Sequence, residues 1–452
     1  MTTTFAYWSA TDLARSIRAS EISPIDVVRS SIDRIHQVND AVNAYCFIYE
    51  EEALARAKKA EEAVLRGELL GPLHGVPIAI KDLTPTAGKR TTMGSFALEN
   101  WIPERNAIIV DRLLEAGAIL VGKTTTSEFA FTGFTQTPLW GVTRNPWNTG
   151  RTCGGSSGGS GVAVATGTVP LAEGSDMGGS VRTPAAFCGI VGFKPSLGRI
   201  PLEWFPTKFD PLLNHGPLAR TVADAALFFD VCHGPAEADP QSLLDRVEIP
   251  PELPTRLDGL RLAMSVDFGH YRIDPDVAGN LRSSADALRD AGAQVEDVCL
   301  EWSQDFYDSW YDHWRVLHAT CFGHYLETWR DKMHPDYVRL LEEGFALKAV
   351  EYKRSEILYS EAWDKLYPIL EKYDALLCPT ESLPAPEFDR AEYEFDGIDD
   401  YGRSLALDMT MQFNALRLPA LSVPSGFTVD GLPTAMQIVG RRCDDLTVLK
   451  IG

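Results

Sequence analysis

The chain has 452 residues, of which 45% are hydrophobic and 23% charged, a balance that is typical of globular proteins. This length exceeds that of one small domain, but an α/β enzyme can arrange it around a single sheet. No segment approaches the roughly 18 consecutive apolar residues of a membrane span. The first residues show neither the basic leader nor the apolar core of a secretory signal, so we expect a cytoplasmic protein.

The charge of the chain is strongly acidic, with 63 Asp and Glu against 42 Lys and Arg and a formal net charge of -21. Proteins that bind nucleic acid draw most of their affinity from Lys and Arg that neutralise phosphates, so we expect no nucleic-acid partner. The eight cysteines form no CxxC pair and the nine histidines show no metal-binding spacing. We therefore expect reduced thiols, no metal and no cofactor.

The N-terminal segment, about residues 1–70, is expected to be helical. Ser23 and Pro24 are typical of a helix N-cap and first turn, and Ile or Val then recurs at helical spacing up to Ile35. Residues 51–67, rich in Ala, Glu, Lys and Arg, continue this helical pattern.

From Gly75 the pattern becomes that of an α/β sheet. Residues 75–82, GVPIAIKD, predict a short buried strand, and residues 107–122 predict a helix followed by a strand. Further strands are expected at 169–173, 261–266, 294–298, 375–378, 421–423 and 434–439. Further helices are expected at 221–232, 275–291 and 302–329.

One segment interrupts this alternation. Residues 234–259 are rich in Pro, Asp and Glu, yet strands resume after them. We therefore expect a surface excursion from one domain rather than a linker between two. The last residues, DDLTVLKIG, predict the beginning of a helix.

Two glycine-rich loops carry serine, at residues 152–160, TCGGSSGGS, and 174–182, GSDMGGSVR. Such loops can bind phosphate through backbone N–H groups, but neither has the lysine of a P-loop or the GxGxxG spacing. A hydrolase nucleophile elbow, GxSxG, fits around Ser156 and again around Ser157, but no strand precedes it. Glycines that only allow tight turns explain one loop, not the second Gly-Gly-Ser followed by Arg and Thr-Pro.

Lys81 offers a base for a serine nucleophile. It ends the apolar run 76–80, which would place its ammonium at the edge of a buried strand, although an exposed strand-end lysine is the commoner case. Burial lowers the pKa of a lysine, and a serine hydroxyl becomes a nucleophile when an adjacent base takes its proton. Lys with Ser replaces His with Asp in some hydrolases, so a catalytic and a structural role both stay open for Lys81.

Four long motifs carry a resemblance to a known family. They are GPLHGVPIAIKD at 71–82, GGSSGGSG at 154–161, GSDMGGSVRTPAAFCGIVGFKP at 174–195 and GPLARTVADAAL at 216–227. The segments GKTTTSEFAF, GVTRNPWN, LPALSVPSG and DGLPTAMQIVG extend it over nearly the whole chain. In this order the motifs resemble the amidase signature family.

The resemblance implies an α/β fold of the amidase signature type, with one large mixed central sheet flanked by helices on both faces. It implies a single domain over residues 1–452, with the catalytic core at about 71–230. Residues 260–452 would complete the sheet and the substrate pocket.

The resemblance also implies a Ser-Ser-Lys triad made of Lys81, Ser156 and Ser180. Ser156 falls on the bridging serine, which the family holds after an unusual cis peptide, and Ser180 falls on the nucleophile. Neutral Lys81 would accept a proton through Ser156 while Ser180 attacks a carbonyl carbon and forms an acyl-enzyme.

The second glycine-rich loop is expected to stabilise the oxyanion through backbone N–H groups. The four expected donors are Met177, Gly178, Gly179 and Ser180. Asp176 is expected to order this loop and Arg182 to anchor it. Supporting hydrogen bonds are expected from Ser157, Ser160 and Ser175.

Two positions depart from the commonest family pattern. Cys153 stands where proline or another small residue is frequent, and Met177 stands where Thr, Ile or Ala is frequent. Because the oxyanion hole uses backbone donors, Met177 should not impair it, and its flexible side chain is expected to line the acyl pocket.

Aromatic side chains gather in three segments, 129–140, 203–209 and 306–329. Any single one is more often core than pocket, but loops with several aromatics often line a site. We therefore expect a hydrophobic or aryl substrate. The expected pocket residues are Phe129, Phe131, Phe134, Met177, Trp204, Phe205 and Phe209.

The leading hypothesis for function is an amidase, a hydrolase of C–N bonds in small-molecule amides, with aryl carbamates (urethanase activity) or esters as further substrates. The rival is the glutaminase subunit of a tRNA-dependent amidotransferase, to which this family also contributes. A non-catalytic binding protein is a third alternative. We expect no membrane association, and a homodimer stays open.

Overall fold

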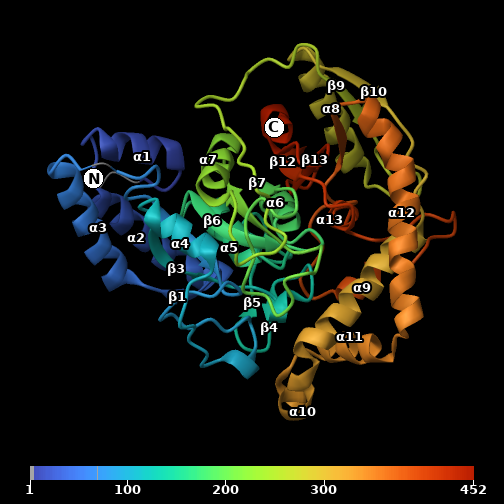
Figure 1. The fold of residues 1–452 in the computed structure, drawn as a ribbon, viewed down its shortest axis with the longest axis horizontal. Coiled ribbons are helices and arrows are strands. Elements are labelled where there is room, and N and C mark those ends of the chain that lie inside the picture. Colours follow the sequence, from blue (N-terminus) through green and yellow to red (C-terminus); the bar gives the residue numbers. More distant parts are fainter. Residues whose placement is uncertain (1–4, 69, 396) are drawn as a thin grey trace.

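The computed structural model describes residues 5–68, 70–395 and 397–452 (Figure 1). Its strands are β1 (Tyr45–Ile48), β2 (Pro77–Lys81), β3 (Ile119–Thr124), β4 (Gln136–Thr137), β5 (Gly141–Val142), β6 (Leu171–Asp176), β7 (Val191–Lys194), β8 (Asn214–Ala219), β9 (Arg261–Met264), β10 (Gln294–Asp297), β11 (Ala375–Pro379), β12 (Ala420–Phe427) and β13 (Pro433–Gly440).

Eleven of these described strands form one sheet in the order β1-β3-β2-β6-β8-β7-β12-β13-β11-β9-β10. The sheet is mixed, because β2 runs parallel to β3 and β6, and β9 runs parallel to β10 and β11, while the other pairings are antiparallel. The strands β4 and β5 form a separate antiparallel pair. The expected α/β architecture with one large mixed sheet is confirmed.

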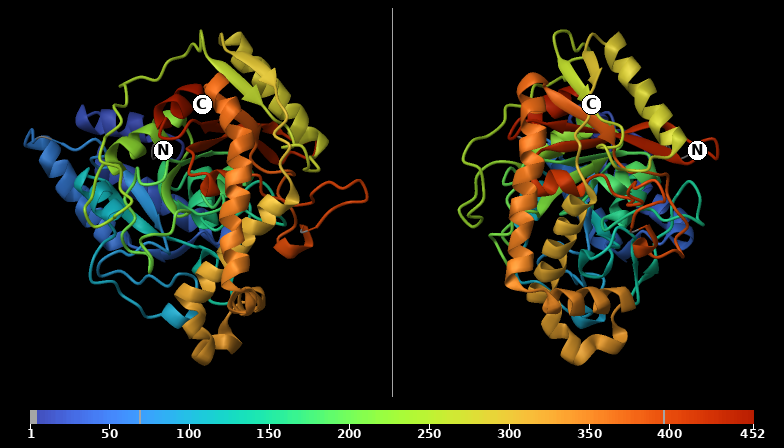
Figure 2. Two further views of the ribbon diagram at one scale, coloured as in Figure 1. Left: turned by 45° about the vertical axis from the view of Figure 1, so that its right-hand side comes forward. Right: turned by 90° about the vertical axis from the view of Figure 1, so that its right-hand side faces the viewer.

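Fourteen α-helices surround the sheet in the described part of the chain (Figure 2). They are α1 (Ala10–Arg18), α2 (Pro24–Val42), α3 (Glu50–Leu65), α4 (Ile108–Glu115), α5 (Gly158–Ala165), α6 (Arg182–Cys188), α7 (Val222–Cys232), α8 (Pro275–Asp290), α9 (Gln304–Phe322), α10 (Leu326–Trp329), α11 (Pro335–Ala346), α12 (Ala349–Lys372), α13 (Met411–Ala415) and α14 (Asp445–Ile451).

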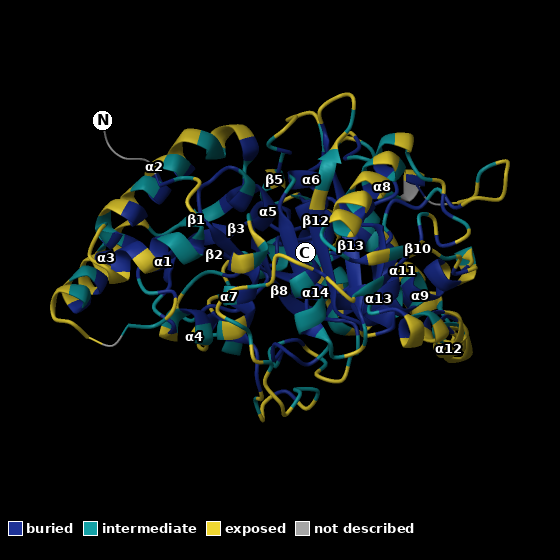
Figure 3. Cartoon of the chain, turned by 90° about the horizontal axis from the view of Figure 1, so that it is seen from above, coloured by how far each residue is buried: buried dark blue, intermediate teal, exposed yellow. Residues whose placement is uncertain are grey.

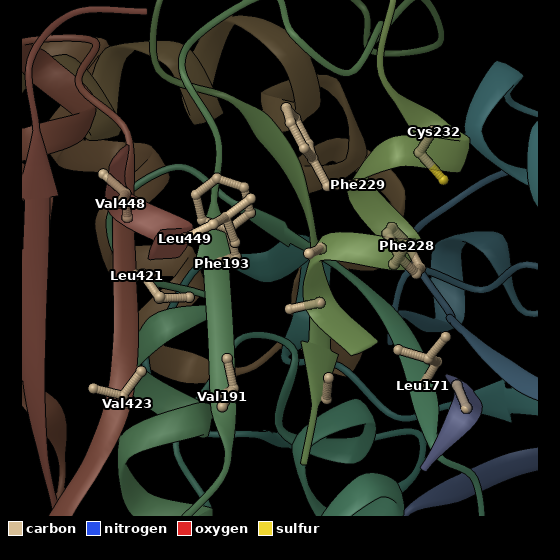
Figure 4. Packing of buried hydrophobic residues seen from close by; sticks show 14 of the residues in the cluster. Leu171, Val191, Phe193, Phe228, Phe229, Cys232, Leu421, Val423, Val448 and Leu449 are labelled. Atoms are coloured by element: carbon tan, nitrogen blue, oxygen red, sulfur yellow. The ribbon is translucent and has the colours of Figure 1, made fainter. Parts of the chain in front are cut away.

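Helices cover both faces of the sheet because successive strand residues point to opposite sides. In β2, Ile78 and Ile80 belong to a core cluster shared with α1, α4, α7, α8 and α14. Ala79, between them, packs instead with residues of α2, α3, α5 and α6. Figure 4 shows the first cluster where Phe193 of β7 and Leu421 of β12 meet Phe229 and Leu449.

The helix boundaries follow from capping chemistry. The Ser23 side chain accepts a hydrogen bond from the N–H of Ile25 at the start of α2, as the sequence predicts for this N-cap. Asp274 does the same for α8, where Pro275 is the first helical residue. The buried residues of these helices are mainly apolar, and Figure 3 shows that each helix has a buried and an exposed side.

The expected strands are present with boundaries shifted by up to four residues, but β1, β4, β5, β7 and β8 were not expected. The segment 302–329 is not one helix, because α9 ends at Phe322 and a 3-10 turn separates it from α10. Between α7 and β9, the described residues form no helix or strand, and this segment arcs over the molecule (Figure 1). Among the described helices, none is long and apolar enough to cross a membrane.

Candidate active site

Lys81 is the last residue of β2 and is fully buried. Its Nζ donates hydrogen bonds to Ser156 Oγ at 2.6 Å and to Ser175 Oγ at 3.0 Å. Ser175 lies in the neighbouring strand β6, whereas Ser156 lies in the loop before α5. The structure therefore brings two serines from distant segments to one lysine.

The surroundings of Lys81 bring its titration close to neutral pH. Burial lowers the pKa of Lys81 to about 7, although the negative charges of Glu173 and Asp176 act in the opposite direction. A lysine whose pKa lies near the ambient pH can exchange a proton with a bonded hydroxyl.

The first glycine-rich loop holds Ser156 through a network of hydrogen bonds. The peptide bond between Gly155 and Ser156 is cis. The N–H of Ser157 donates to the carbonyl of Ser180 at 3.2 Å, and Ser157 Oγ donates to the carbonyl of Ser175 at 3.2 Å. Ser157 thus ties the first loop to the strand and the loop that follow it.

The second glycine-rich loop leaves β6 and carries Ser180 to the wall of a cavity. Ser180 is half-buried, whereas Ser156 and Ser175 are almost fully buried. Ser156 and Ser180 line one small cavity together. Of these three serines, Ser180 is therefore the most accessible to a substrate.

Asp176 and Arg182 form the anchor of this loop. The Arg182 guanidinium donates two hydrogen bonds to the Asp176 carboxylate, at 3.0 and 2.8 Å, and both residues are fully buried. Burial alone would raise the pKa of Asp176, but the charge and hydrogen bonds of Arg182 lower it to about 2. Arg182 also donates to Gln437 and Asn414, so the loop is held from three elements.

One expected oxyanion donor is already engaged. The N–H of Gly179 donates to Asp176 Oδ1 at 2.9 Å, and the N–H of Val181 donates to Asp176 Oδ2 at 3.1 Å. The expectation of a free Gly179 donor is therefore corrected. In the described part of the chain, the backbone N–H groups of Met177, Gly178 and Ser180 have no hydrogen-bond acceptor.

Two small cavities flank Ser180, with volumes of about 30 and 10 Å³. The larger cavity is lined by Phe131 and by Trp310, Tyr311 and Trp314 of α9. Gly178 permits the close approach of Trp310, because a Cβ at this position would collide with the indole ring.

Five of the seven expected pocket residues line one of three neighbouring cavities. Phe131 lines the larger cavity, and Phe129, Met177 and Phe205 line the smaller one. Phe134 lies next to these, in a third cavity that shares Phe131.

The other two expected pocket residues lie outside the two cavities beside Ser180. Phe209 is 78% exposed, and Trp204 points its indole N–H at His215. The segment 203–209 therefore contributes only Phe205 to the cavity wall, because the loop turns outward after this residue.

Two acidic side chains in the larger cavity were not expected. Glu392 accepts hydrogen bonds from Thr132 Oγ1 and from the N–H of Gly133, and Asp408 accepts one from Thr183 Oγ1. Burial raises the pKa of Asp408 to about 6. No Lys or Arg is among the described residues that line either cavity beside Ser180.

Sequence reasoning also missed Glu173 and His215, which lie behind Lys81. Glu173 Oε2 accepts a hydrogen bond from the Lys81 N–H at 3.1 Å, and its Oε1 lies 2.8 Å from His215 Nδ1. An acidic residue inside an otherwise apolar strand was the available signal for Glu173. His215 had no comparable signal, because β8 was not expected.

Comparison with known proteins agrees with this geometry. A model of the amidase family matches residues 26–449. An acylamidase from Rhodococcus erythropolis is 37% identical over an alignment 459 residues long, which covers all of this chain and 95% of the relative. A glutamyl-tRNA(Gln) amidotransferase subunit from Carboxydothermus hydrogenoformans is 36% identical over 480 residues, covering 99% of this chain and 96% of the relative.

Solved structures show the same similarity in three dimensions. A bacterial aryl acylamidase of the amidase signature enzymes superposes with a TM-score of 0.92 at 29% identity, covering 98% of this chain and 94% of that one. A 6-aminohexanoate cyclic dimer hydrolase complexed with substrate superposes with a TM-score of 0.86 at 28% identity, and the superposition covers 99% of this chain and 96% of that one. The chain belongs to the amidase signature family. It is a hydrolase that acts on C–N bonds.

Proposed function

We propose that the protein is an amidase that cleaves aryl or other hydrophobic amides through an acyl-enzyme on Ser180. The observation that carries this proposal is the fully buried Lys81, whose two side-chain partners in the described structure are the hydroxyls of Ser156 and Ser175. Ser156 shares a cavity with the half-buried Ser180, so we infer that a proton passes from Ser180 through Ser156 to Lys81.

The reaction begins with two coupled proton transfers. Neutral Lys81 takes the proton of Ser156 Oγ while Ser156 takes the proton of Ser180 Oγ. Ser180 Oγ then forms a bond with the substrate carbonyl carbon, and the carbonyl oxygen becomes an oxyanion. The same path returns the proton to the leaving nitrogen as the C–N bond breaks. Water repeats these steps on the ester carbon and releases the acid.

The oxyanion is stabilised by N–H groups at the start of the second loop. Met177, Gly178 and Ser180 offer donors that are not used elsewhere in the described structure, whereas Gly179 uses its donor on Asp176. A fixed donor at this position lowers the barrier by about 3 kcal/mol. The buried Arg182–Asp176 pair keeps these donors in place before the substrate arrives.

The aromatic lining supports an aryl or hydrophobic substrate. Phe131, Trp310 and Trp314 surround the larger cavity beside Ser180, and flat rings bind well between aromatic side chains. Aryl carbamates and aryl esters present the same carbonyl to Ser180, so we include them as further substrates.

The glutaminase function is the second candidate, because the amidotransferase relative from Carboxydothermus hydrogenoformans is 36% identical. Glutamine carries a free carboxylate, which needs a cationic partner in a buried site. Neither cavity beside Ser180 has a Lys or Arg among its described lining residues, and Glu392 and Asp408 would repel the carboxylate. We infer that glutamine is not the preferred substrate and that the enzyme acts without tRNA.

A panel assay of the purified chain tests this proposal. Glutamine, an aryl anilide, an aryl carbamate and an aryl ester are compared with wild-type protein and with the Ser180→Ala variant. We expect hydrolysis of the anilide by the wild type alone. Hydrolysis of glutamine only, and only in the presence of partner subunits, would favour the glutaminase instead. No hydrolysis of any substrate by the wild type, with substrates bound equally by the wild type and the Ser180→Ala variant, would favour a non-catalytic role.

A further inference from the structure

A chain of three side chains leads from Trp204, the neighbour of the cavity residue Phe205, to Lys81. Trp204 Nε1 donates a hydrogen bond to His215 Nε2 at 2.9 Å, and His215 Nδ1 lies 2.8 Å from Glu173 Oε1. The other carboxylate oxygen, Oε2, accepts the backbone N–H of Lys81 at 3.1 Å. Glu173 and His215 are buried, so their contact is shielded from solvent.

The indole of Trp204 determines which nitrogen of His215 carries the proton. An indole N–H can only donate, so His215 Nε2 has to be the acceptor and cannot hold a proton of its own. The imidazole proton then sits on Nδ1 and is donated to Glu173. A second proton on the ring would point at the indole N–H, which the geometry disfavours.

A neutral His215 leaves the negative charge of Glu173 in place. Thr84 Oγ1 donates to the same carboxylate at 2.9 Å, which adds a second neutral donor. Burial alone would raise the pKa of Glu173, but its hydrogen bonds, first of all the one from His215, and the positive charge around it lower the pKa below its ordinary value. Glu173 is therefore held as an anion by three donors, which come from His215, Thr84 and the backbone of Lys81.

The other charged groups around this anion lie on neighbouring elements. Lys123 of β3 approaches Asp82 to 3.6 Å, and these two opposite charges compensate each other. Asp176, further along β6, is paired with Arg182. From α7, the buried Cys232 thiol faces Glu173, and burial keeps its pKa well above the ordinary value. Lys81 of β2 differs from Lys123 and Arg182, because its Nζ forms no ion pair with a carboxylate in the described structure.

We propose that Trp204 and His215 keep Glu173 as a buried anion, and that this anion sets the proton affinity of the base Lys81. Burial without a nearby anion would make the amine too weak a base to take the proton of a serine. Glu173 restores part of this basicity without bonding to Nζ, so Nζ stays free to contact Ser156 and Ser175. Glu173, His215 and Trp204 are positioning residues, and this inference rests on the proposed function of Lys81.

The same chain connects the base with the substrate cavity. Phe205 follows Trp204 directly and lines the cavity that contains Ser156 and Ser180. The ring of Phe205 also packs against Trp204 and Phe322. A displacement of this loop would therefore change the donor to His215 as well as the shape of the cavity.

The test is the pH dependence of kcat/KM for an aryl anilide in the wild type and three variants. At low pH, kcat/KM falls as Lys81 becomes protonated, and this fall is the acid limb of the profile. For Glu173→Gln, the loss of a negative charge near Lys81 should move the acid limb down by about one pH unit. For Trp204→Phe, His215 loses the donor that fixes its tautomer and its bond to Glu173, so the limb should move in the same direction by about half a unit. In His215→Gln, the amide can donate to Glu173 and accept from Trp204, so this variant is the matched control and its limb should stay in place.

Two results would overturn the inference. One is a Glu173→Gln enzyme that is folded and active but has an unmoved acid limb. The other is an upward shift in either Glu173→Gln or Trp204→Phe. If Glu173→Gln does not fold, the milder Trp204→Phe variant decides, because this ring is only half-buried. Failure of the proposed function is distinguished by the Ser180→Ala variant, which would then retain activity.

Discussion

Two buried lysines in the central sheet share the same titration range but have different surroundings. Lys81 and Lys194 are both fully buried, and burial lowers the pKa of each to about 7. Lys81 Nζ donates to two serine hydroxyls, whereas Lys194 Nζ donates to the backbone carbonyls of Pro195 and Leu418, at 3.0 and 2.5 Å.

The difference shows that a lowered pKa does not by itself make a lysine a catalytic base. A carbonyl oxygen has no proton to give, so the partners of Lys194 cannot pass one to it. The hydroxyl of Ser156 can both donate and accept, and it lies between Lys81 and a cavity. We therefore assign the base by its bonding partners and treat Lys194 as a structural residue that joins β7 to the segment before β12.

The largest effect is expected from Lys81→Met. The variant removes the base and leaves a side chain of similar length in an apolar environment, so kcat for an aryl anilide should fall by about 10⁴-fold or more. Thermal unfolding should stay close to that of the wild type, because the partners of Nζ in the described structure are hydroxyls and not a carboxylate. If activity fell only as far as the folded fraction of the protein falls, Lys81 would have a structural role like that of Lys194.

A large loss of stability is expected from Asp176→Asn. Arg182 would keep its charge in a fully buried position without its carboxylate partner, and breaking such a pair costs about 3–5 kcal/mol. Denaturant unfolding measures this change. Arg182→Met combined with Asp176→Asn is the matched control, and it should recover part of the lost free energy of unfolding. An Asp176→Asn protein with unchanged stability would contradict the anchoring role.

The pH profile separates Lys81 from a permanently charged lysine. In the proposed mechanism the neutral form of Lys81 is the base, so kcat/KM should fall about tenfold for each pH unit below about 7 and level off above it. Stopped assays with an aryl anilide between about pH 5 and 9 would show this limb. A rate that rises as the pH falls would mean that the charged amine is the active form.

The smallest effect on activity is expected from Lys194→Met. The carbonyls of Pro195 and Leu418 would lose a donor, which costs about 1–3 kcal/mol of stability for a buried acceptor. Because Lys194 contacts neither Ser156 nor Ser180, kcat of the folded fraction should stay within about threefold of the wild type. A kcat that falls as far as in Lys81→Met would remove the contrast between the two lysines.

The sequence indicated the fold class and many elements, but not the residues behind the site. The motifs around Lys81, Ser156 and Ser180 could be found because the three side chains lie within long, ordered patterns. Helix caps such as Ser23 were visible because capping is a local interaction. The helix break at Phe322 was missed, since apolar and aromatic residues continue across it at a spacing that still fits a helix.

Residues that act through long-range contacts could not be predicted. Trp204 was expected in the pocket, but its indole N–H bonds to His215, which lies in a strand that was itself not expected. Gly179 was expected as an oxyanion donor, and only the folded loop shows that Asp176 uses its N–H. In both cases the partner of a donor depends on tertiary structure, which local patterns do not contain.

The central claim is that Ser180 is the nucleophile and Ser156 the bridge to Lys81. The most direct measurement treats the purified enzyme with a serine-directed fluorophosphonate and maps the modified peptide by mass spectrometry. We predict a single adduct on Ser180 in the wild type and its loss in Lys81→Met. An adduct on Ser156, or equal labelling without Lys81, would contradict this assignment.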